Sequence, residues 1–105
     1  MPSDLSSLGR FAEPSLLILS SLAGGPKHGY AITKDVEEWG GSTLGPGTLY
    51  AALARLEKLG LIEALPAEER RRPYRLTGVG AAALRAELLR LERLFSVGLR
   101  RLAAT

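Results

Sequence analysis

Cysteine is absent from the 105 residues of this sequence, and histidine occurs only once. Without cysteine the chain cannot form disulfides or a zinc site built on thiolates, and this composition fits the reducing cytoplasm. The single histidine, His28, has no carboxylate at ligand spacing beside it. We therefore expect no metal site, and we expect His28 to have a local structural role at the start of a helix.

Long apolar runs are absent as well. No segment approaches the roughly 20 apolar residues that a membrane-spanning helix requires. Residues 1–10 lack the apolar core of a signal peptide. We therefore expect a soluble cytoplasmic protein that does not bind membranes.

Motifs for catalysis and for cofactor binding are also missing. The segment AGGPKHG places glycines beside Lys27, but it lacks the Gly-Lys-Ser/Thr order of a phosphate-binding loop. Serines are present, yet nothing in the sequence fixes a Ser–His–acid triad. We expect no catalytic residues, no cofactor and no enzymatic activity.

Charge is small in total but uneven along the chain. The formal net charge is +3, and the first 45 residues are net acidic. Residues 78–105 hold five arginines against two glutamates, and four further arginines lie between residues 70 and 75. Clustered arginine in the second half favours a polyanionic partner such as nucleic acid.

Two short helices are predicted in the first 40 residues. Pro14 suits the first turn of a helix over residues 13–23, and Gly24 and Gly25 end it. The segment HGYAITKDVEEWG, residues 28–40, places its apolar residues on one stripe, as an amphipathic helix does. We expect that stripe to lie in the core, and its members are Gly29, Ile32, Val36 and Trp39.

A third helix is predicted from about Pro46 to about Leu59, with Gly60 ending it. Its buried stripe is formed by Leu49, Ala52, Leu53 and Leu56. The opposite face carries Gly47, Ala51, Ala54, Arg55 and Lys58, with Thr48 and Tyr50 on its flanks. Most side chains on this face are small, and the charged ones are basic. Because small residues let a helix backbone approach another surface, it is a candidate contact surface.

After Gly60 the spacing of the apolar residues no longer fits a helix. Two short apolar runs, residues 61–65 and 73–76, flank a seven-residue connection rich in arginine. This pattern predicts a β-hairpin with a long tip, which must pack against helices to be stable. Thr77 can then cap a long final helix whose apolar spacing is close to a heptad.

Three helices followed by a hairpin is the order of a winged helix-turn-helix, a mainly α fold with a small β-hairpin (α+β). In this architecture the third helix enters the DNA major groove, and the hairpin, or wing, reaches the flanking backbone or minor groove. We divide the chain into an N-terminal extension (residues 1–12), a winged helix-turn-helix DNA-binding domain (13–77) and a C-terminal dimerisation helix (78–105).

Three motifs, GPKHGYAI, GTLYAALARLEKLGLI and RRRPYRLTGVG, resemble the PadR family of bacterial transcriptional regulators in their order and spacing. The resemblance covers about residues 13–80 and is to the short form with a single C-terminal helix. It implies a homodimeric repressor-type regulator that pairs through this helix and releases DNA when a small effector binds. It implies no catalysis.

The resemblance also implies roles for individual residues. Thr48 and Tyr50 occupy positions where the family's recognition helix presents polar side chains to DNA, and an arginine run occupies the wing. Ala51 replaces a larger or charged residue that is common in the family, so it offers only thymine-methyl packing or a phosphate contact. The DNA-contact candidates are Thr48, Tyr50, Ala51, Arg55, Lys58, Arg70, Arg71, Arg72 and Tyr74. We expect the wing to contribute affinity, and Thr48 and Tyr50 to set register and some sequence preference.

The final helix carries an apolar stripe that is longer than three short helices can cover. We expect a partner subunit on it, and a two-fold dimer predicts an inverted repeat in double-stranded DNA with half-sites about one helical turn apart. The interface candidates are Leu84, Leu88, Leu91, Phe95, Leu99 and Leu102. Leu91, Leu94 and Phe95 form an apolar wall that would suit an uncharged or aromatic effector.

Each assignment has an alternative. The tyrosine rings can fill the core, the wing arginines can be merely solvated beside Glu68 and Glu69, and the final helix can pack on its own domain. At the level of function, the alternative is an adaptor that uses the winged fold and its long helix to bind another protein, without a specific DNA site.

Overall fold

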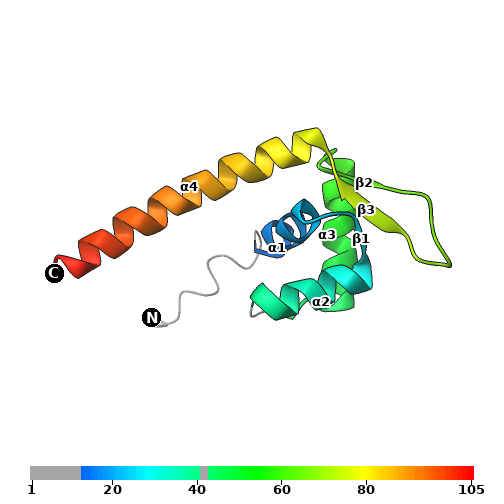
Figure 1. Cartoon of the computed structure of the whole chain (residues 1–105), viewed down its shortest axis with the longest axis horizontal. Helices are drawn as coiled ribbons and strands as arrows, with labels where there is room; N and C mark the ends of the chain where they lie inside the picture. The colour runs from blue at the N-terminus through cyan, green and yellow to red at the C-terminus, as the bar shows by residue number, and fades with distance from the viewer. Residues whose placement is uncertain (1–12, 41–42) are drawn as a thin grey trace.

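The computed structural model describes residues 13–40 and 43–105, so the N-terminal extension lies outside the described residues. It confirms the expected class, mainly α with a small antiparallel sheet (Figure 1). The elements in chain order are α1 (Glu13–Ala23), β1 (Lys27–His28), α2 (Gly29–Gly40), α3 (Pro46–Lys58), β2 (Ile62–Ala64), β3 (Pro73–Leu76) and α4 (Gly78–Ala103).

The hydrophobic core lies where α1, α2 and α3 meet the sheet and the first turns of α4. Most of the apolar residues that the spacing of α1, α2 and α3 predicts to be buried lie in this core, because residues three and four apart share one face. The buried apolar residues are Ile18, Leu19, Leu22, Ile32, Val36, Leu44, Leu49, Ala52, Leu53, Leu56, Ile62 and Leu84.

Trp39 is not part of this core, so the prediction that it is buried is wrong. Its side chain is 50% exposed in the last turn of α2. Trp39 lies at the edge of the stripe, and its side chain lowers the pKa of the Asp35 carboxylate, which lies one turn earlier on α2. Ser21, which is 2% exposed, donates a 2.7 Å hydrogen bond to the same carboxylate. Ser21 first and Trp39 second hold the pKa of Asp35 below its usual value, because both stabilise the charged form.

The sheet has three strands in the order β1–β3–β2, all antiparallel, rather than the two predicted. Lys27 pairs with Tyr74 and His28 with Pro73, so the segment before α2 covers the outer edge of β3. A strand of two residues leaves no alternation pattern in a sequence, which explains why it was missed.

The wing, residues 62–76, also differs from the expected hairpin with a long tip. Pairing continues beyond the strands, since the Leu65 N–H donates to the Pro73 carbonyl (2.8 Å). Glu68 and Arg71 exchange two backbone hydrogen bonds of 2.7 and 2.8 Å. The connection is therefore a tight turn centred on Glu69 and Arg70, which have φ of 47° and 75°. Such turns normally carry Asn-Gly, so neither residue signals one.

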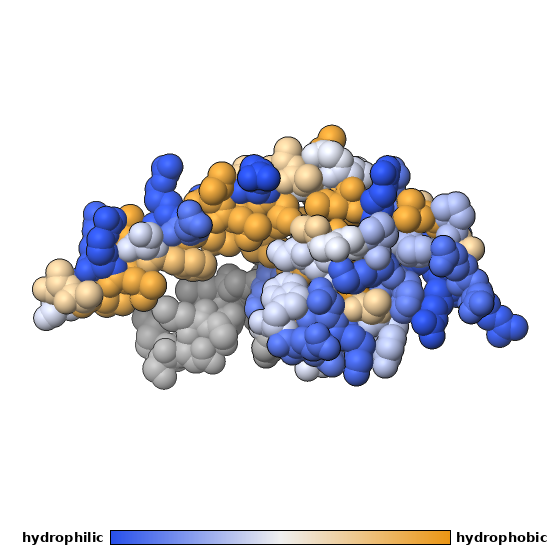
Figure 2. All heavy atoms as spheres, in the orientation of Figure 1, coloured by the Kyte–Doolittle hydropathy of each residue, from blue (hydrophilic) through white to orange (hydrophobic). Residues whose placement is uncertain are grey.

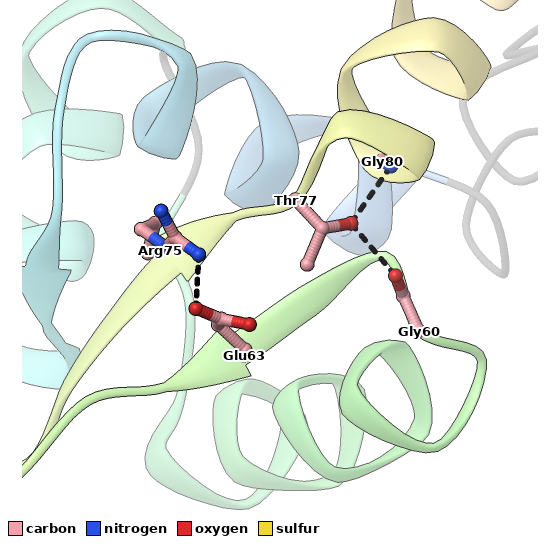
Figure 3. A network of polar contacts seen from close by, with 5 residues as sticks. All are labelled: Gly60, Glu63, Arg75, Thr77 and Gly80. Carbon is pink, nitrogen blue, oxygen red and sulfur yellow. Dashed lines mark hydrogen bonds and ion pairs between the residues drawn. The ribbon is translucent and has the colours of Figure 1, made fainter.

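Thr77 fixes the start of α4, as its capping position predicts (Figure 3). Its hydroxyl accepts a 3.0 Å hydrogen bond from the Gly80 N–H and donates a 2.7 Å bond to the Gly60 carbonyl at the end of α3. Gly80 then approaches the α3–β2 turn so closely that a Cβ on it would lie 1.9 Å from the Leu61 oxygen. The beginning of α4 is thus tied to the end of α3.

Beyond its first turns α4 projects away from the other elements (Figure 1). The radius of gyration is 15.5 Å, whereas a compact chain of this length has about 13 Å. Leu84 is 5% exposed and belongs to the core of its own chain, so its assignment to a dimer interface is corrected. Further along, Leu88, Leu94, Phe95, Leu99 and Leu102 are exposed, and Figure 2 shows hydrophobic residues over much of this helix.

Candidate nucleic-acid interface

The third helix, α3, presents outward the small face that its sequence pattern predicts. Its four apolar stripe residues are buried, and the residues between them are exposed. The exposed DNA-contact candidates on α3 are Thr48, Tyr50, Ala51, Arg55 and Lys58. Gly45 is the N-cap residue and has no side chain to cap the first turn, and the helix begins at Pro46. A small-residue face of this kind allows close approach to a broad surface.

The wing lies beside α3 because β2 follows α3 after only a short turn. Gly60, with φ of 76°, reverses the chain there. Arg75 forms an ion pair with Glu63 across β2 and β3, so its charge is locally compensated (Figure 3). The other arginines of the wing lie nearer its tip, beside Glu68 and Glu69, where hydrophilic residues dominate the surface in Figure 2.

The three arginines near the tip are held differently. Arg72 donates a 3.1 Å hydrogen bond to the Leu65 carbonyl, which keeps its side chain on the wing. Arg71 reaches β1, where its Nη1 lies 3.2 Å from Nε2 of His28. Arg70 lies in the turn itself and is exposed. The arginine run is thus partly ordered by contacts within the chain rather than freely solvated.

His28 has the local role expected of it. It directly precedes α2, and its Nδ1 lies 3.4 Å from the Ala31 N–H, as in a helix cap. A neutral imidazole has one acceptor nitrogen, and a guanidinium can only donate. Only one of the two contacts can therefore be a hydrogen bond at a time, and the contact to Arg71 is the shorter.

A groove of about 370 Å³ runs between the start of α2, the exposed side of α3 and the wing. It brings together residues that are far apart in the sequence. Its lining residues are His28, Gly29, Tyr30, Tyr50, Arg70, Arg71, Arg72 and Tyr74. Tyr50, Tyr74 and the arginines are among the DNA-contact candidates predicted from the sequence. His28 and Gly29 of the His-Gly-Tyr motif were missed, because only the unpredicted pairing of β1 with β3 places that motif beside the wing.

Tyr74 is half-buried on β3 and packs against the core. Burial and then the nearby Glu57 carboxylate raise the pKa of its phenol, and Arg72 opposes this shift. A phenol is protonated at neutral pH even without this shift, and the raised pKa favours the same form, so the hydroxyl can donate a hydrogen bond.

Within residues 13–40 and 43–105, no three His, Asp or Glu side chains are placed to hold a metal ion. No helix in this part of the chain is both long and apolar enough to cross a membrane.

The fold and the exposed face of α3 define a winged-helix protein of the kind that regulates transcription. The model of the PadR-like family of transcriptional regulators matches residues 18–86. The chain therefore belongs to the PadR-like family, as its three motifs predict. The family consists of transcriptional regulators and not of enzymes.

Solved structures agree with this assignment. A transcriptional regulator from Clostridium thermocellum is 32% identical, with a TM-score of 0.79 over 92% of this chain and 97% of that one. A PadR family transcription regulator from Clostridium difficile is 30% identical, with a TM-score of 0.78 over 87% of this chain and 99% of that one.

One curated relative is longer than this chain. An uncharacterized 37.1 kDa protein in transposon TN4556 of Streptomyces fradiae is 45% identical over 85 residues, which are 81% of this chain and 25% of that protein. The chain thus spans about a quarter of the length of this relative.

Proposed function

We propose that this protein is a homodimeric, sequence-specific DNA-binding repressor that a small effector releases from its site. The observation that carries the proposal is the juxtaposition of the small, basic face of α3 with an arginine-rich wing. In a winged helix these two elements contact the major groove and the flanking backbone. Membership in a family of transcriptional regulators supports the same conclusion.

The dimer places two copies of α3 on one face of the DNA. Its support is the apolar face of α4, which is exposed from Leu88 to Leu102 in the single chain. Two-fold symmetry makes the proposed site an inverted repeat in double-stranded DNA, with half-sites separated by about one helical turn.

The proposed effector is an apolar or aromatic small molecule. Leu94 and Phe95 are exposed on α4, and Leu91 is half-buried there. A dimer that pairs through α4 would place these side chains near its central groove. A second apolar groove of about 390 Å³, lined by Ala23, Leu76, Ala81, Leu84, Arg85, Leu88 and Leu89, lies where α4 leaves the core. An effector bound at either surface would contact α4 and so affect the orientation of this helix.

Selection of bound sequences from a random duplex pool, followed by footprinting, tests the DNA-binding proposal. We expect an inverted repeat, and a single asymmetric half-site would contradict the symmetric dimer. Failure to bind any duplex would favour the alternative, an adaptor that binds another protein.

Changing Arg70, Arg71 and Arg72 to Ala tests the wing. We expect weaker binding to the selected site and to random DNA alike, and the slope of log affinity against log salt should fall by roughly 0.9 for each phosphate that the variant no longer binds. The matched control removes the same charge from exposed positions of α4, with Arg93, Arg100 and Arg101 changed to Ala. A triple wing variant with the slope of the control would show that the wing is merely solvated.

A further inference from the structure

Tyr50 lies on α3, but its phenol is directed toward the start of α2. A Cβ placed on Gly29 would be 3.0 Å from the Tyr50 hydroxyl oxygen and 3.3 Å from its Cζ. The tip of the ring therefore packs against the backbone of Gly29, in space that exists only because this residue has no side chain. Tyr50 is 57% exposed, and this contact places the tip of its ring against Gly29.

The hydroxyl lies in the groove that also contains the wing arginines. Arg71 is held there by its contact with His28, and a guanidinium with five N–H donors keeps most of them available after one such contact. Tyr50, Arg71 and Tyr74 thus bring hydrogen-bond donors from α3, the wing and β3 to one place.

Carboxylates are absent from the described lining of this groove. Glu68 and Glu69 line a neighbouring groove, which they share with His28, Arg71 and Pro73. The donor-rich groove therefore suits an anion with several acceptor oxygens, and its opening beside α3 suits an anion that belongs to a long polymer. A phosphodiester of the DNA backbone has this chemistry.

We propose that Tyr50 and Arg71 together bind one phosphate of the DNA backbone, with Gly29 and His28 as the residues that position them. This inference rests on the proposed DNA-binding function, and it limits Tyr50, for which register and some sequence preference are predicted, to a contact with the backbone. Tyr50 fixes the protein on the backbone, and sequence preference comes from Thr48 and the residues along α3.

Tyr50→Phe is the sharpest variant, because it removes the hydroxyl and keeps the ring packed on Gly29. We expect about tenfold weaker binding to the selected site and to random duplex alike, the effect of one hydrogen bond to a charged group. Arg71→Gln should weaken both to a similar extent and lower the salt slope by roughly 0.9. Because both side chains bind one phosphate, the double variant should be weakened by less than the product of the two single effects.

Thr48→Val and Arg75→Gln are the matched controls. Thr48→Val should weaken binding to the selected site only, and Arg75→Gln should change little because Arg75 is paired with Glu63. Duplexes in which one phosphate at a time is replaced by an uncharged methylphosphonate then locate the contact. One replacement in each half-site should weaken wild type and leave the affinity of Tyr50→Phe/Arg71→Gln unchanged.

Three results would overturn the proposal. The first is that Tyr50→Phe weakens binding to the selected site but not to random duplex. The second is that the effects of the two substitutions multiply fully in the double variant. The third is that the methylphosphonate replacements that weaken wild type weaken the double variant as well. All three require wild type to bind DNA, so they differ from a failure of the proposed function, in which wild type binds no duplex.

Discussion

Gly80 lies against the Leu61 carbonyl at a distance that leaves no space for a side chain. Gly80→Ala must displace either the start of α4 or the α3–β2 turn, and we expect it to lower the free energy of unfolding by about 3 kcal/mol, as overpacking does. Gly78→Ala is the control, since a Cβ there meets nothing within 4 Å. Urea unfolding of the two variants measures the difference, and equal midpoints would contradict the close approach.

Individual residues were predictable where local chemistry determines their role. Thr77 was identified as a cap because a threonine before an apolar helical pattern suits that position. Trp39 and Leu84 were placed wrongly, because burial at the end of a stripe depends on where the neighbouring elements stop. Helical periodicity alone does not contain that information.

The turn of the wing is held in an unfavourable backbone conformation. Glu69 and Arg70 both have positive φ, which costs a residue with a side chain about 1 kcal/mol or more. Replacing them with Asn-Gly, the pair this turn prefers, should stabilise the hairpin by about 1 kcal/mol. We expect slower hydrogen exchange at the amides of Glu68 and Arg71, which bond across the turn.

Ala67→Asn, outside the turn, serves as the control for that change. Exchange that is equally fast in the Asn-Gly variant and in wild type would show that the turn does not limit the stability of the wing.

Elements were predicted well where they are long and poorly where they are short. The bounds of α1 and the start of α3 follow from proline and glycine at their ends. The strand β1 is defined by pairing with distant residues, and the turn at Glu69 lacks the Asn-Gly pair that usually marks such a turn, so no local pattern identifies either. The groove beside Tyr50 depends on both and could not be predicted for the same reason.

Among residues 13–40 and 43–105, the face of α4 beyond Leu84 is a large apolar surface. Phe95 and Leu99 are 58% and 68% exposed in the single chain, so charged substitutions there should not disturb its core. Burial of such side chains is worth roughly 1.5–3 kcal/mol each. We therefore expect Phe95→Glu/Leu99→Glu to be a folded monomer in sedimentation equilibrium, whereas wild type at micromolar concentration is a dimer.

Arg93→Gln, on the polar side of α4, should remain dimeric. Circular dichroism tests whether the double variant is folded. A monomeric wild type, or a double variant that still dimerises, would contradict pairing through this face.

The junction at Thr77 has a mechanical consequence in the proposed dimer. A single hydroxyl bonds the Gly60 carbonyl, just after α3, and the first turn of α4, so the helix that faces DNA and the helix that would pair the subunits are tied at one junction. Twenty-six residues make α4 roughly 39 Å long. Over that length a tilt of about 5° displaces one end by roughly 3 Å, close to the rise of one base pair, about 3.4 Å. The angle at this junction would then determine the half-site spacing that the dimer accepts. A ligand or substitution that bends the junction would change the accepted spacing, and it would leave the affinity for a single half-site unchanged.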